Sequence, residues 1–224
     1  MRRALRILST VLIAAGALLL ADGAATLLWE EPVSSLYARI QQDRLEDELA
    51  ELERSGPPLA ERRVLARLPD PGRRLRFAAR AALRRLDEGD PVGRLRAGAI
   101  GLDEIVVHGT GGADLRKGSG HYPGTPLPGA GGTVAIAGHR TTYGAPFRRI
   151  DDLEPRDRIE LELPYGSFTY RVERTRIVAP TATWVTHRVA YDRLVLTACH
   201  PLYSASQRIV VFARLERSAP TFGS

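Results

Sequence analysis

The sequence predicts an all-β domain of the sandwich or barrel type in the C-terminal part of the chain, preceded by helices. From residue 92 onward, glycine and proline become frequent, and short runs rich in β-branched residues lie between them. These runs recur at modest spacing with turn residues between them, which is typical of sheets that fold into a sandwich or barrel. The predicted strands occupy residues 92–96, 105–108, 133–137, 158–163, 166–178, 194–197 and 208–215.

The longest predicted strand, residues 166–178, has the clearest pattern. Phe168, Tyr170 and Val172 alternate with polar or charged neighbours, as in a half-exposed antiparallel strand. The whole domain is expected over residues 91–217, with a tail at 218–224, and its size allows a core that folds without disulfides. Residues 109–132 are rich in glycine and proline and are expected to form a long loop, which is often functional.

The N-terminus predicts a membrane anchor. Residues 1–6 contain three arginines and precede an apolar stretch over residues 7–29. A helix of this length crosses a hydrocarbon layer of about 30 Å, and the positive cluster orients residues 1–6 to the cytoplasm. An uncleaved single-pass transmembrane anchor is therefore preferred, with a cleaved signal peptide as the alternative. Both place the rest of the chain at the outer side of the cell membrane.

Residues 30–90 are predicted to be a helical linker. A charged helix with a narrow apolar stripe is expected over residues 32–55, ended by Gly56-Pro57-Pro58. A solvated spacer is the preferred interpretation of this helix, and a coiled-coil seam or a lid on the domain are the alternatives. A second helix over residues 73–86 is rich in arginine, which could contact anionic head groups or wall polymer.

The composition of the chain argues against some classes of binding partner and some kinds of site. The formal net charge is +6, and Lys117 is the only lysine among the basic residues. Because no recognised nucleic-acid reader motif is present, nucleic acid is not expected as a partner. Cys199 is the only cysteine, which excludes an intramolecular disulfide and a metal site built from several cysteines.

Two apolar runs end in reactive side chains. Cys199 follows the run 194–198, and His139 follows the run 133–138. If these strands are neighbours, the imidazole can help a thiol of ordinary pKa ~8.5 to supply thiolate and can later protonate a leaving amine. Arg208 lies nine residues beyond Cys199, where a hairpin could return its guanidinium to stabilise an oxyanion.

These segments resemble the sortase family. Residues 196–199, with Arg208 after them, resemble the sequence around the sortase nucleophile and its arginine. Residues 137–147 resemble the catalytic-histidine segment of class E sortases of high-GC Gram-positive bacteria, and residues 120–129 are similar to the loop that precedes it. Ala198 departs from the family pattern, which usually has Thr before the cysteine.

The resemblance implies a sortase-like eight-stranded β-barrel and a cysteine transpeptidase that acts on LPxTG-like or LAxTG-like sorting signals. It implies Cys199 as nucleophile, His139 as acid and base, and Arg208 as oxyanion donor. The implied partners are sorting-signal peptides of surface proteins and the amine of a peptidoglycan precursor. No cofactor is implied, and no acidic cluster is assigned to a metal. The candidate substrate-binding residues are Thr197, Ala198, Tyr143, Tyr122, His121 and His200.

Two other interpretations remain. Another cysteine–histidine enzyme of the wall, such as an L,D-transpeptidase or a papain-like hydrolase, would also use a thiol and an imidazole. L,D-transpeptidases usually carry arginine two residues after the cysteine, where this chain has Pro201. The non-enzymatic alternative is a membrane-tethered β-domain in which Cys199 is merely buried.

Overall fold

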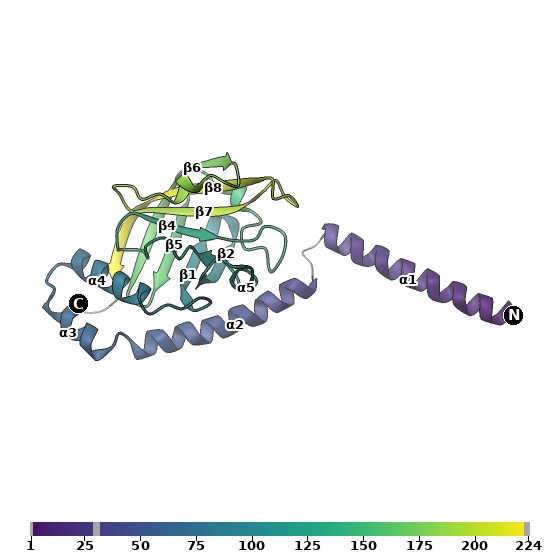
Figure 1. The fold of residues 1–224 in the computed structure, drawn as a ribbon, viewed down its shortest axis with the longest axis horizontal. Helices are drawn as coiled ribbons and strands as arrows, with labels where there is room; N and C mark the ends of the chain where they lie inside the picture. The colour runs from purple at the N-terminus through teal and green to yellow at the C-terminus, as the bar shows by residue number, and fades with distance from the viewer. Residues whose placement is uncertain (1, 29–31, 222–224) are drawn as a thin grey trace.

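Eight strands close into a barrel in this computed structural model, which describes residues 2–28 and 32–221 (Figure 1). Around the barrel the order is β1-β2-β3-β4-β7-β8-β6-β5, and β5 pairs again with β1. The β2–β3 and β4–β7 pairs are parallel, and the others are antiparallel. The all-β barrel prediction is confirmed. The strands are β1 (Pro91–Ala97), β2 (Leu102–His108), β3 (Gly120–His121), β4 (Thr133–Ala137), β5 (Arg158–Leu163), β6 (Gly166–Val178), β7 (Arg193–His200) and β8 (Gln207–Pro220).

The strands differ from prediction where the hydrophobic signal is weak. β3 was missed because two residues inside a glycine-rich loop carry no alternation. β8 runs to Pro220, past the predicted strand end at residue 215 and into the predicted tail. Beyond Leu215 it continues through the polar residues 216–218, yet it stays paired with β6 as far as Gly166 opposite Pro220. Backbone pairing extends this strand where side-chain pattern does not.

Alternating side chains fill the barrel. In β5, Ile159, Leu161 and Leu163 are buried, while the charged residues between them face outward. Helix α4 (Pro71–Leu83) adds Leu75, Ala78 and Ala79 to the same core. It covers the end of the barrel near Gly166, where an added Cβ would lie 2.7 Å from Leu75. Arg208 lies at the other end of β8. The helix therefore covers the end of the barrel that is opposite the candidate site.

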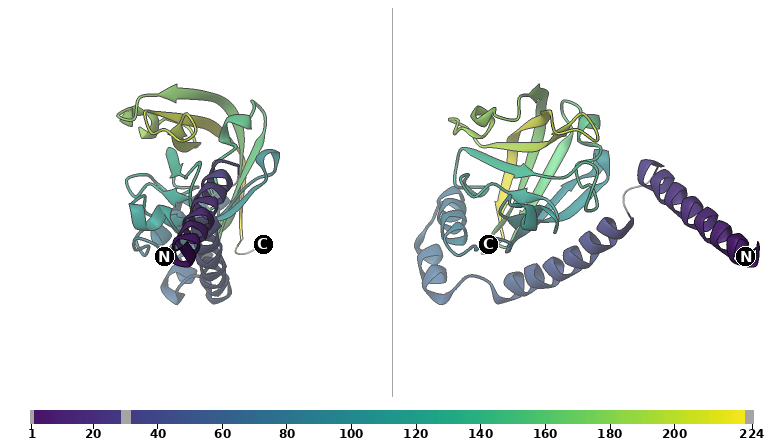
Figure 2. Two further views of the ribbon diagram at one scale, coloured as in Figure 1. Left: turned by 90° about the vertical axis from the view of Figure 1, so that its right-hand side faces the viewer. Right: turned by 45° about the vertical axis from the view of Figure 1, so that its right-hand side comes forward.

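Three other helices of the described residues precede the barrel: α1 (Arg2–Leu28), α2 (Pro32–Ser55) and the shorter α3 (Leu59–Arg67). α1 forms where the membrane anchor was predicted over residues 7–29, and it points away from the barrel (Figure 2). Over the residues that the structure describes, no helix combines the length and apolar character needed to cross a membrane. Residue 29, the end of the predicted span, lies outside the described residues.

The interpretation of residues 32–55 as a solvated spacer is wrong. The helix itself forms as predicted, but α2 lies along the outside of the barrel (Figure 1). Leu45 and Leu49 are buried against Ile105 and Val107 of β2. The narrow apolar stripe is therefore a docking face. Beside it, Glu46 pairs with Arg94 of β1, and the Gln42 amide hydrogen-bonds to the backbone of Ile105 of β2.

Candidate active site

Cys199 and Arg208 face each other across the β7–β8 pair. They are directly opposed in the antiparallel register, so their side chains lie on the same face of the sheet. That face is the outside of the barrel, because Leu196 and Ala198 of β7 point into the core. Cys199 is half-buried and its thiol is free.

His139 joins the same row from β4. This strand pairs in parallel with β7, and Ala137 lies beside Thr197. The Gly138 N–H donates to the Thr197 carbonyl at 3.1 Å, which continues the pairing past the end of β4. Two residues further along each strand are His139 and Cys199. The ends of three adjacent strands thus bring imidazole, thiol and guanidinium to one edge of the outer face.

The environment of His139 sets its protonation state. The His139 carbonyl accepts the Phe147 N–H at 2.9 Å, and the Phe147 ring is fully buried in the core. His139 itself is half-buried, and this burial lowers the pKa of the imidazole below its ordinary value of 6.5. The ring is therefore mainly neutral at pH 7 and can accept a proton.

Arg208 is held by the turn between β7 and β8. Its Nη1 donates to the carbonyls of Ala205 and Gln207, each at 2.9 Å. Within the described part of the chain, the other guanidinium nitrogens of Arg208 make no hydrogen bond. A charged donor thus lies opposite the thiol with hydrogen-bonding capacity to spare, as an oxyanion requires.

Arg140 connects the strand ends that carry His139 and Cys199, and it was not predicted from the sequence. Its guanidinium is buried, and Nη2 donates to Asp151 at 2.6 Å and to the Arg148 carbonyl at 3.1 Å. Its Nη1 also lies 3.4 Å from Nδ1 of His200. Arg140 follows His139 and His200 follows Cys199, so this contact joins the residues next to the imidazole and the thiol. An arginine at the end of an apolar run gives no sequence signal for burial.

Three of the candidate substrate-binding residues lie near this row. Thr197 shares the outer face with Cys199, and its hydroxyl lies 3.0 Å from the Tyr122 hydroxyl. The Tyr143 ring lies against His139, with 5.4 Å between ring centroids. Tyr143 thus lies beside His139, and Tyr122 lies beside Thr197, two residues before Cys199 on the same face.

Two other candidates point elsewhere. The Ala198 side chain faces the barrel core, so it is not presented to a peptide at the surface. His200 lies on the opposite face of β7 from Cys199 and contacts Arg140.

His121 lies outside the site. It is 1% exposed, its Nδ1 is 3.1 Å from Nδ1 of His108, and its Nε2 lies near Thr125 and the Pro126 carbonyl. This burial lowers the pKa of His121 to about 4. A side chain so enclosed cannot contact a surface peptide, so the prediction that His121 binds substrate is corrected. It supports the loop that carries Tyr122.

The segment between β6 and β7 covers the outer face beside the site. Its short 3-10 helix η3 (Thr183–Thr186) places the Trp184 ring in a stack on Phe212, with 6.1 Å between centroids. The buried Arg193 fixes this segment by donating to the Val185 carbonyl at 3.0 Å and the His187 carbonyl at 2.9 Å. The resulting apolar cluster consists of Ala135, Val185, Val195, Val210 and Phe212.

A separate cavity lies away from this row of side chains. It has a volume of about 540 Å³, lies between α2, α3, α4 and the barrel, and is lined by none of Cys199, His139 and Arg208. Across residues 2–28 and 32–221, no group of three or more His, Cys, Asp or Glu side chains could hold a metal ion. The candidate site itself consists of a thiol, an imidazole and a guanidinium on the outer face of the barrel.

That combination of side chains on a closed β-barrel is suited to cysteine acyl transfer. Comparison with known proteins gives the family: the sortase domain model matches residues 95–216, just over half of the 224 residues. The chain belongs to the sortase family, whose members are cysteine transpeptidases.

Its relatives agree. Sortase D of Bacillus subtilis (strain 168) is 34% identical over 132 residues, which cover 57% of this chain and 65% of that protein. Sortase SrtE1 of Streptomyces coelicolor is 30% identical over 115 residues, covering 45% of this chain and 33% of that protein. The chain thus spans less than two thirds of the length of these relatives. The structure of sortase E from Streptomyces avermitilis superposes with a TM-score of 0.55 at 32% identity, over 60% of this chain and 93% of that one.

Proposed function

We propose that this protein cleaves an LAxTG-like or LPxTG-like sorting signal between Thr and Gly and transfers the protein to an amine of the cell wall. The observation that carries the proposal is the row of His139, Cys199 and Arg208 across β4, β7 and β8. Each side chain has a separate role in exchanging one amide bond for another.

In the first half-reaction, the neutral His139 imidazole takes the proton of the Cys199 thiol as sulfur attacks the Thr carbonyl carbon. The carbonyl oxygen becomes an oxyanion, and Arg208 donates hydrogen bonds to it. The tetrahedral intermediate collapses as the C–N bond breaks and the His139 imidazolium protonates the departing Gly amine. A thioester between Thr and Cys199 remains.

In the second half-reaction, an amine of a peptidoglycan precursor attacks the thioester. His139 accepts its proton, and Arg208 again holds the oxyanion. The C–S bond then breaks, and the His139 imidazolium returns the proton to the Cys199 sulfur, which restores the thiol and the neutral imidazole. One amide bond has broken and one has formed, so no oxidant, metal or nucleotide enters the balance. The low pKa of His139 suits this cycle, since the imidazole must begin each half-reaction as a base.

We also propose that the catalytic domain works outside the cytoplasm, at the cell membrane. The basic residues 1–6 followed by the apolar residues 7–29 support this location. Labelling of Cys199 in whole cells by a thiol reagent that does not cross membranes tests it. Labelling only after lysis would contradict it.

The activity is tested with a fluorogenic LAxTG peptide and a second LPxTG peptide, each incubated with the full chain and an added amine. The proposal predicts a product in which the amine is joined to Thr, and no such product from Cys199→Ala. Hydrolysis of wall muropeptides without transfer would instead favour another wall hydrolase. An unreactive Cys199 in the folded chain would favour a non-catalytic domain.

A further inference from the structure

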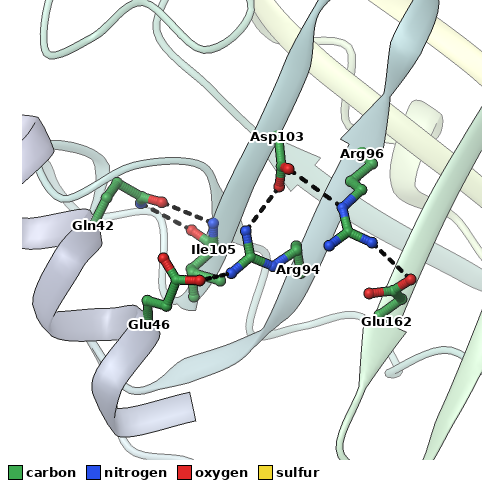
Figure 3. A network of polar contacts seen from close by, with 7 residues as sticks. All are labelled: Gln42, Glu46, Arg94, Arg96, Asp103, Ile105 and Glu162. Carbon is green, nitrogen blue, oxygen red and sulfur yellow. Dashed lines mark hydrogen bonds and ion pairs between the residues drawn. The ribbon is translucent and has the colours of Figure 1, made fainter. Parts of the chain in front are cut away.

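Helix α2 is fastened to the outside of β1 and β2 by specific polar contacts (Figure 3). The Gln42 carboxamide pairs with both backbone groups of Ile105: it donates to the carbonyl at 3.1 Å and accepts the N–H at 2.8 Å. Its nitrogen also donates to the Lys117 carbonyl at 2.9 Å. One turn on, Glu46 pairs with Arg94 of β1. These contacts prevent α2 from sliding along its axis and from rotating about it.

The same helix reaches the loop that carries the catalytic histidine. We define the His139 loop as residues 139–147. The hydroxyl of Ser34, near the start of α2, accepts the Tyr143 N–H at 3.2 Å. The Tyr37 ring meets the Tyr143 ring edge-on, at 6.5 Å between centroids and 73° between planes. Ala38 packs so close that its Cβ lies 3.4 Å from where a Cβ on Gly144 would be.

The His139 loop needs external support. Tyr143 has φ +52° and Ala145 has φ +43°, so two non-glycine residues occupy the left-handed region. Such residues are uncommon there, and they persist only when the surroundings determine the backbone. Around Tyr143, part of those surroundings is α2, through the Ser34 hydroxyl on its N–H and the Tyr37 ring on its side chain.

Tyr143 in turn contacts the imidazole. Its ring lies 5.4 Å from the His139 ring, at 42° between planes. We propose that α2 positions His139, with Tyr37 acting through Tyr143, so that the helix before the barrel is part of the catalytic apparatus. Tyr37 is a positioning residue, since it does not touch the reacting atoms. This inference rests on the proposed transpeptidase function for its kinetic test, but its structural test is independent of that function.

The expected effect follows from the geometry of proton transfer. A displacement of about 1 Å in a catalytic group can cost ~10²-fold in rate. Loss of the Tyr37 ring loosens Tyr143 without touching Cys199, Arg208 or the face beside them. We therefore expect kcat for peptide transfer to fall at least about tenfold, with KM within twofold of the unaltered protein.

The experiment compares four variants of the full chain: Tyr37→Ala, Tyr37→Phe, Leu36→Ala and Gln42→Ala. Tyr37→Phe keeps the ring and should retain activity. Leu36→Ala is the matched control, because Leu36 is the neighbouring residue on α2 and is 60% exposed. Gln42→Ala removes the hydrogen bonds that hold α2 to Ile105 and Lys117. It should therefore reproduce part of the loss in kcat. If Tyr37→Ala does not fold, Gln42→Ala tests the same positioning role of α2.

Titration of the His139 ring by NMR gives a readout that does not depend on turnover. In the unaltered chain, burial holds the pKa of His139 below 6.5. In Tyr37→Ala and Gln42→Ala the loosened loop should let the pKa rise toward 6.5, whereas Tyr37→Phe and Leu36→Ala should leave it unchanged. If the unaltered chain transfers no peptide, the proposed function fails, and the titration alone decides on the positioning role. An unchanged His139 pKa together with unchanged kcat overturns the inference, and a faster Tyr37→Ala overturns it by showing that α2 obstructs the site.

Discussion

Replacing Arg140 by methionine should destabilise the protein much more than the same replacement at Arg149. Arg140→Met keeps an unbranched side chain in the buried space but removes the guanidinium that donates to Asp151 and to the Arg148 carbonyl. Arg149→Met removes an arginine that pairs with Asp152 through side chains that are 59% and 51% exposed. The two changes therefore compare a buried arginine with an exposed one in the same segment.

The magnitude follows from the contacts. A hydrogen bond to a charged group contributes about 1.5–3 kcal/mol and a neutral one about 1 kcal/mol. The Asp151 side chain is 46% exposed and can regain water, and the Arg140 Nε is buried without a partner among the described residues. Both facts lower the expected cost to about 2–3 kcal/mol, whereas an exposed pair such as Arg149–Asp152 contributes less than ~1 kcal/mol.

The assay is thermal and urea unfolding of both variants beside the unaltered chain. For a protein of this length the loss corresponds to a Tm lower by about 5–10 °C for Arg140→Met, and to a small change for Arg149→Met. Peptide transfer should also fall in Arg140→Met, because the link to His200 is lost. Equal Tm values for the two variants, or a Tm of Arg140→Met equal to that of the unaltered chain, would show that the buried Arg140 guanidinium does not stabilise the fold.

Three other changes test the site and its support. Gly138→Ala places a methyl group 2.6 Å from the Phe147 ring, so urea unfolding should show a loss of about 1–3 kcal/mol and transfer assays a loss of activity; wild-type values for both would contradict this packing. Tyr165→Phe removes the 2.8 Å hydrogen bond to the Pro128 carbonyl and should cost about 1–2 kcal/mol in unfolding free energy, which a neutral result would disprove. Burial lowers the pKa of His121 to about 4 from 6.5, so the unfolded chain binds the proton more tightly. The free energy of unfolding therefore keeps the whole contribution of neutral His121 above pH ~6.5, and it falls by about 3 kcal/mol as the pH drops to ~4. His121→Gln should lessen that dependence in unfolding measurements at several pH values, and an identical pH dependence would contradict the assignment.

The strand bounds could be predicted from the sequence wherever the apolar pattern of the side chains covers the same residues as the backbone pairing. β4, β5 and β6 begin and end at the predicted residues, since each is an apolar or alternating run bounded by turns. The same reasoning placed Cys199 and His139 at strand ends. Their meeting depended on the parallel pairing of β4 with β7, which no local pattern specifies.

The parts that were missed depend on long-range polar contacts. α2 docks through Gln42, whose partners lie 63 and 75 residues away in the sequence. A glutamine on a charged helix gives no sign that its amide will pair with a distant strand. The sequence also gives no sign that Arg140 is buried, because its partners come from the loop that follows it and from His200. The inward direction of Ala198, by contrast, follows from the alternation of β7 and could have been predicted.

The most direct test of the proposed mechanism is the mass of the acyl-enzyme. The full chain is mixed with an LAxTG peptide without added amine, quenched in acid, and analysed by intact-mass and peptide-mapping spectrometry. The proposed mechanism predicts an adduct equal to the peptide through Thr, bound at Cys199, which disappears when an amine is added and does not form in Cys199→Ala or His139→Ala. Cleavage between Thr and Gly that persists in Cys199→Ala, or an adduct on another residue, would contradict it.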